Sequence, residues 1–65
     1  MDAVPDEDIA MFARGLLGRQ GPRALTYAKD HAQRLATLRD EDGARVWARV
    51  ADAVAARIGK LGPSH

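Results

Sequence analysis

His31 and Tyr27 carry the side chains of this sequence that are best suited to chemistry, because an imidazole can move a proton or bind a metal ion. A helix would place them one turn apart on the same face. Nothing completes a site around them: there is no Cys, the second His is the last residue, and no Ser is placed to act as a nucleophile. We therefore expect no catalytic residue, no cofactor and no metal ligand. An enzymatic function would return only if the fold gathered Tyr27, His31 and an acidic side chain in one pocket.

The run Asp40-Glu41-Asp42 concentrates carboxylates, which are the oxygen ligands that divalent cations prefer. The spacing of oxygen ligands in a calcium-binding loop is absent, however, and Asp is among the favoured residues at a helix N-cap. We expect Asp40 to cap a helix and Glu41 and Asp42 to lie in its first turn, where negative charge opposes the helix dipole.

Arginine supplies most of the positive charge, which acidic residues balance to a formal net charge of +1. Solvated helix faces are the expected role of these side chains, and contact with RNA or DNA is the alternative. Interleaved acids and few aromatic residues oppose that alternative. The arginines considered are Arg14, Arg19, Arg23 and Arg39, near expected helix ends, and Arg45 and Arg49, on one helix face. A helix-turn-helix motif is excluded because the helix before the acidic turn is too long for it and phosphate would repel the acids.

Three segments must position these residues, since apolar side chains recur at helical spacing in residues 7–17, 22–38 and 41–58. No stretch alternates with the period of a strand. The tails, residues 1–5 and 62–65, are expected to be flexible.

Capping residues set the expected ends of these helices. Asp6 is the expected N-cap of the first helix, and Gly18 the residue that ends it. Gly21-Pro22 opens the second helix, because Pro suits the first helical position. Gly59 or Gly62 is expected to end the third.

Short loops require the helices to pack as neighbours. We predict an all-α, three-helix domain in which residues 22–38 and 41–58 form an antiparallel hairpin and residues 7–17 pack across its open face. Gly15 is expected where a neighbouring helix passes close by. The large side chains available to the core are Phe12, Leu16, Leu17, Leu25, Leu35, Leu38, Trp47, Val50, Val54 and Ile58.

Trp47 is the only tryptophan. Its place in the apolar stripe favours burial in the core, and an anchor in an interface is the alternative. If Met11, Val46 or Leu61 is exposed beside one edge of Trp47, these side chains would form a dimer or partner surface.

The chain has 65 residues and forms one domain, residues 1–65, for which folding removes only about 60% of the unfolded surface from water. Because no disulfide or metal can add stability, we expect a protein partner or a homo-oligomer. No apolar run approaches the roughly 18 residues of a membrane span, so no membrane association is expected. The acidic N-terminus and the absence of Cys favour the cytoplasm.

The sequence resembles a family of small helical proteins of unknown function found mainly in alphaproteobacteria. The resemblance spans Asp8 to Ile58 and implies a three-helix fold and a bacterial source, without an activity. Its residues are Asp8-Ile9, Leu16-Leu17, Ala28, Ala32, Leu35, the run Asp40-Glu41-Asp42-Gly43 with Trp47, Val50 and Ala53-Val54. The Asp-x-x-Gly-x-x-x-Trp element is the distinctive part. Arg39 stands where those proteins usually have Gly, which implies a different C-cap on the preceding helix.

These features together predict a non-enzymatic helical protein–protein interaction module, or a small accessory or regulatory protein. A weak nucleic-acid-associated regulator that uses the arginine faces is the alternative.

Overall fold

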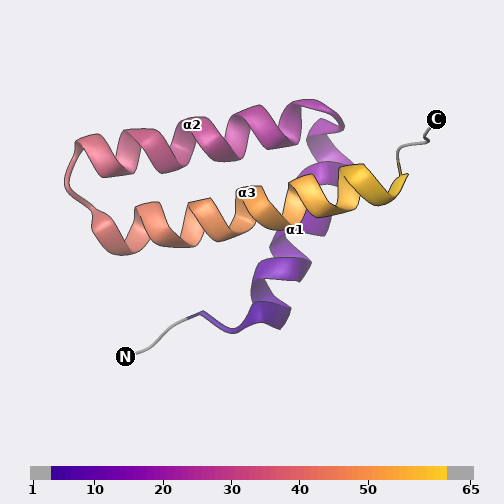
Figure 1. Cartoon of the computed structure of the whole chain (residues 1–65), viewed down its shortest axis with the longest axis horizontal. Helices are drawn as coiled ribbons and strands as arrows, with labels where there is room; N and C mark the ends of the chain where they lie inside the picture. Colours follow the sequence, from indigo (N-terminus) through magenta and orange to yellow (C-terminus); the bar gives the residue numbers. More distant parts are fainter. Residues whose placement is uncertain (1–3, 62–65) are drawn as a thin grey trace.

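The computed structural model describes residues 4–61, and the side chains of residues 4–59. Within them the chain forms α1 (Asp6–Gln20), α2 (Arg23–Thr37) and α3 (Glu41–Leu61), and no strand. The hairpin of α2 and α3 is antiparallel, and α1 crosses behind α3 and packs against both helices (Figure 1). The predicted all-α architecture is therefore confirmed. None of the described helices combines the length and apolar character needed to cross a membrane.

The first and the last helix of the chain, α1 and α3, are longer than predicted. Helix α1 passes through Gly18 and ends at Gln20, and its C-cap is Gly21. At Gly21 the backbone has φ 59° and ψ −136°, a conformation that is nearly restricted to glycine. Gly18 therefore does not end the helix. Helix α3 likewise continues through Gly59, while Gly62 lies outside the described residues.

The start of α1 also differs from the prediction. Pro5 is the N-cap residue, and its carbonyl oxygen accepts hydrogen bonds from the backbone N–H groups of Asp8 and Ile9, at 3.0 and 3.1 Å. Asp6 is the first helical residue and makes no capping hydrogen bond. The predicted flexible tails fall in part on residues 1–3 and 62–65, which are outside the described residues.

The turn between α2 and α3 combines two capping motifs. Arg39 has φ 67°, and its N–H donates to the Ala36 carbonyl oxygen at 3.0 Å. The next N–H, of Asp40, donates to the Leu35 carbonyl oxygen at 2.8 Å, which completes a Schellman motif. Asp40 then caps α3, because its Oδ1 accepts the Gly43 N–H at 3.1 Å. The predicted N-cap is confirmed, and the left-handed position is occupied by arginine.

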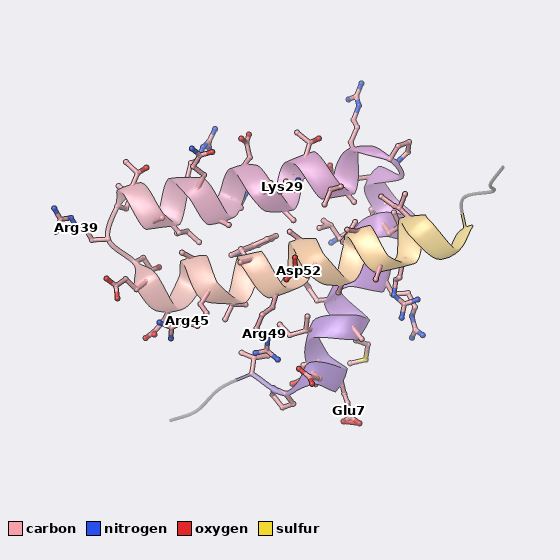
Figure 2. The ribbon with its side chains drawn as sticks, in the orientation of Figure 1. Glu7, Lys29, Arg39, Arg45, Arg49 and Asp52 are labelled. Atoms are coloured by element: carbon pink, nitrogen blue, oxygen red, sulfur yellow. The ribbon has the colours of Figure 1, made fainter. Side chains whose placement is uncertain are left out.

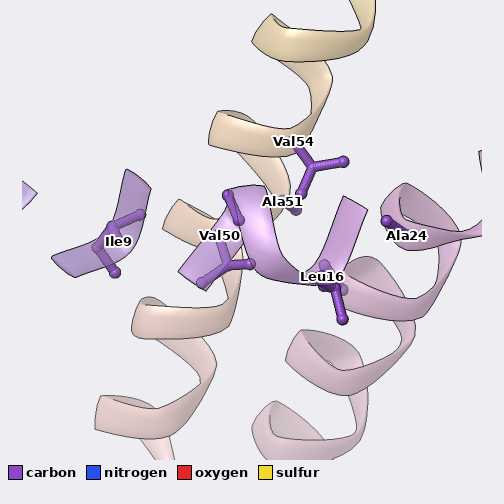
Figure 3. Packing of buried hydrophobic residues seen from close by; sticks show 8 residues of the cluster. Ile9, Leu16, Ala24, Val50, Ala51 and Val54 are labelled. Atoms are coloured by element: carbon purple, nitrogen blue, oxygen red, sulfur yellow. The ribbon is translucent and has the colours of Figure 1, made fainter. Parts of the chain in front are cut away.

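The core is built from small side chains (Figure 3). Its buried residues are Ile9, Ala13, Leu16, Ala24, Ala28, Val50, Ala51 and Val54, and half of them are alanines. Such side chains allow close helix packing but bury little apolar surface each. Leu17, Leu25, Trp47 and Ile58 pack around this core and are partly buried.

The prediction of the core is wrong for two residues, which are exposed. Leu38 is 73% exposed, because it follows the last turn of α2 and forms the C-cap. Phe12 is 43% exposed and lies at the edge of the α1 interface. The close helix approach predicted at Gly15 is also absent, because Gly15 is exposed and a Cβ atom there would meet nothing within 4 Å.

Arg49 links α3 to the beginning of α1. Its Nη1 donates to the Val4 carbonyl oxygen at 2.7 Å, and its Nη2 bonds the Asp6 carboxylate. Figure 2 shows Arg49 pointing from α3 toward the start of α1. Arg49 is thus only partly exposed, and it fixes the position at which α1 begins rather than forming a solvated face.

Candidate interaction surface

Three rings from α1 and α2 meet around the ring of Trp47 in α3. We call Phe12, Tyr27, His31 and Trp47 the aromatic cluster. Phe12 comes from α1, Tyr27 and His31 from α2, and Trp47 from α3. The cluster is therefore a product of the tertiary fold, and no single helix carries it.

The rings use two kinds of contact. Phe12 and Tyr27 approach Trp47 edge to face, with centroid distances of 5.3 and 5.9 Å and interplanar angles of 79° and 70°. His31 lies 4.4 Å from Trp47 and 4.8 Å from Tyr27, with tilted planes. Edge-to-face and offset arrangements are the favourable ones for aromatic pairs, so the cluster holds its rings in defined orientations.

Local sequence explains part of this arrangement. Tyr27 and His31 are four residues apart in α2 and therefore project from the same face. That face runs beside the alanines Ala24 and Ala28, which are fully buried. Because these alanines bring α2 close to its neighbours, the larger rings are placed at the edge of the helix interface.

The cluster is open to solvent. Phe12 is exposed as stated above, Tyr27 is 38% exposed, and His31 and Trp47 are partly buried. Within residues 4–59, the Tyr27 hydroxyl, the His31 ring nitrogens and the Trp47 indole N–H make no hydrogen bond to another protein group. The cluster thus presents apolar ring surface together with polar atoms that a bound molecule can use.

Trp47 is partly buried, and its role as an interface anchor stays a prediction. One part of the side chain packs against the buried core, and another part contacts the three exposed or half-buried rings. A half-buried tryptophan at a surface cluster is the arrangement typical of an interface anchor.

The other residues proposed from the sequence for an interface are not gathered around Trp47 in the same way. Met11 is 58% exposed and lines a shallow depression on α1 with Glu7, Asp8, Ala10 and Arg14, which includes no ring of the cluster. Val46 is partly buried against the core. Leu61 belongs to α3, but its side chain is outside the described ones.

Helical periodicity assigns Phe12 to the core and does not identify Tyr27 as an interface residue. The spacing of Tyr27 and His31 was the available signal, since two rings on one helix face form a continuous patch. Phe12 offered no such signal, because its exposure depends on the angle at which α1 crosses the hairpin.

The geometry also bears on the chemistry considered for His31. The structure brings the Tyr27 and His31 rings together. The third side chain beside them is the Trp47 indole, where an enzymatic site would need an acidic side chain. No carboxylate of the described residues lies within salt-bridge distance of the His31 ring. Among the same residues, no group of three or more acidic or histidine side chains is arranged to hold a metal ion.

Two of the arginines considered for contact with RNA or DNA, Arg45 and Arg49, bind other groups of the protein. Arg45 Nη1 lies 3.7 Å from Asp42 Oδ1, one turn away on α3. Arg49 is bound to the start of α1 as described. These two arginines share a helix, and both have an acidic neighbour.

Comparisons of the chain with protein-family models, with curated proteins and with solved structures gave no match. The resemblance to small alphaproteobacterial helical proteins stays a prediction.

Proposed function

We propose that this chain is a non-enzymatic helical interaction module, or a small accessory protein, that binds another protein through the aromatic cluster. The observation that carries the proposal is the meeting of Phe12, Tyr27 and His31 around Trp47 at the protein surface. Helices α2 and α3 hold one side of the cluster and α1 holds the other, so the surface is already formed before a partner arrives.

Aromatic side chains favour this role for a physical reason. They offer a large contact area and lose little conformational freedom on binding, and Trp and Tyr are enriched among residues that dominate binding energy. Burial of such an apolar patch would also add to the stabilisation that a core rich in alanine supplies.

The partner would be a protein segment that presents apolar side chains, such as one face of an amphipathic helix. We place this interaction in the cytoplasm. A weak nucleic-acid role for the arginine faces stays the alternative, and the acidic neighbours of Arg45 and Arg49 do not favour it.

The proposal is tested by affinity capture with the full chain and two single variants. Tyr27→Ser removes an exposed ring of the aromatic cluster, and Met11→Ser removes an exposed side chain of α1 that is outside it. We expect the wild type and Met11→Ser to capture the same protein, and Tyr27→Ser to lose it.

Circular dichroism shows whether each variant keeps its helices. Equal capture by both variants, with both folded, would contradict the assignment of the surface. Titration with labelled RNA and duplex DNA at two salt concentrations tests the alternative, since phosphate contacts weaken steeply as salt rises.

A further inference from the structure

A second surface lies in the groove between α2 and α3, and no residue of α1 lines it. We call it the hairpin groove. Its walls are Lys29, Ala32, Gln33 and Ala36 of α2 and Ala44, Ala48, Ala51 and Asp52 of α3. None of these residues belongs to the aromatic cluster, so an interaction here is independent of the function proposed above.

The alanines alone would not identify a binding partner, because small residues occur wherever two helices approach closely. The specific feature is a pair of opposite charges on opposite walls. Lys29 extends from α2 and Asp52 from α3, at the same level along the hairpin (Figure 2). Both are exposed, and neither forms an ion pair with another described residue.

This arrangement is complementary to itself. A two-fold axis that runs along the hairpin groove, parallel to the helices, turns a second copy so that its α3 lies over α2 and its α2 lies over α3. Rotation about such an axis does not change the position of a residue along the direction of the helices. Lys29 of each copy therefore faces Asp52 of the other, and the contact forms twice.

We propose that the hairpin groove binds a second copy of this chain, in a four-helix arrangement of two hairpins. The alanine walls let the facing helices approach, and the two Lys29–Asp52 contacts set the register and orientation. The aromatic cluster is not part of this dimer and stays available for a different protein.

Charge reversal tests the proposal directly, by sedimentation of the full chain. The wild type sediments as a dimer, at twice the chain mass of 7.0 kDa. Lys29→Asp places two acids opposite each other and Asp52→Lys two lysines. Each variant alone should dimerise about 100-fold more weakly or worse, because like charges facing across an interface repel.

Mixing the two variants provides the decisive measurement. In a mixed pair every reversed residue faces its opposite charge, so the two monomeric variants should form a heterodimer when combined. Both substitutions are at exposed helix positions, and circular dichroism confirms that each variant is folded. A wild type that stays monomeric at millimolar concentration, reversed variants that dimerise normally, or a mixture that stays monomeric would each overturn the proposal.

Discussion

The His31 imidazole lies over the Trp47 indole, with ring centroids 4.4 Å apart and planes tilted by 38°. Because this contact joins α2 to α3 at the aromatic cluster, we expect His31→Ala to lower the free energy of unfolding by about 1 kcal/mol. Urea denaturation followed by Trp47 fluorescence and by circular dichroism measures the change. Arg34→Ala, at an exposed position on the same helix and outside both the aromatic cluster and the hairpin groove, is the matched control and should have little effect. Equal losses in both variants would show that the ring contact contributes nothing.

Two glycines of the α1 region should respond to alanine with opposite signs. Gly18 is inside α1, and a Cβ atom added there would have no neighbour within 4 Å, so Gly18→Ala should raise the free energy of unfolding by about 0.5–1 kcal/mol. Gly21 has open space as well, but its φ of 59° and ψ of −136° strain any residue with a Cβ atom. Gly21→Ala should therefore lower the free energy of unfolding by about 1–3 kcal/mol. Thermal denaturation of the two variants gives both signs, and a gain from both would contradict the α1–α2 turn.

Arg39 holds the left-handed position of the Schellman motif with a φ of 67°. Replacing it with glycine removes the steric cost of a Cβ atom there, so Arg39→Gly should raise the free energy of unfolding by about 1 kcal/mol. Arg39→Ala keeps the Cβ atom and serves as the control, with little change expected. Chemical denaturation compares the three chains. A similar gain from alanine would locate the effect in the arginine side chain instead of the backbone.

Arg49 joins the middle of α3 to the residues that begin α1. Arg49→Ala should lower the free energy of unfolding by about 1–2 kcal/mol, since a partly buried charged donor is lost. Amide hydrogen exchange should accelerate most in the first turn of α1. Arg45→Ala is the control, because its ion pair with Asp42 is largely exposed and should contribute less than about 1 kcal/mol. Unchanged exchange near Ile9 in the Arg49 variant would argue against the link.

Periodicity was sufficient to predict the three helices and the α2–α3 hairpin, because both depend on local patterns and short loops. Asp40 was also predictable as a cap, since its role depends only on the residues that follow it. The end of α1 was not, because both Gly18 and Gly21 are plausible at a helix end. Only the packed chain shows which of them adopts a positive φ.

The candidate surface was harder to predict than the fold. Phe12 and Leu38 fit the apolar pattern of a core, but the angle of α1 and the early end of α2 leave both exposed. Trp47 was identified from its type alone, whereas its three ring neighbours come from distant parts of the chain. Helical spacing assigns residues to a face, and it does not determine how far a neighbouring helix covers that face.

The fully buried alanines of the core should tolerate substitution less well than several of the larger apolar residues do. Ala13, Ala24 and Ala28 are completely inaccessible and sit where helices touch, so even one added methylene group must push a helix outward. The bulkier Leu38 and Met11 are exposed and can vary with little effect on folding. A complete single-site substitution library of this chain should accordingly show its strictest positions at its smallest buried side chains.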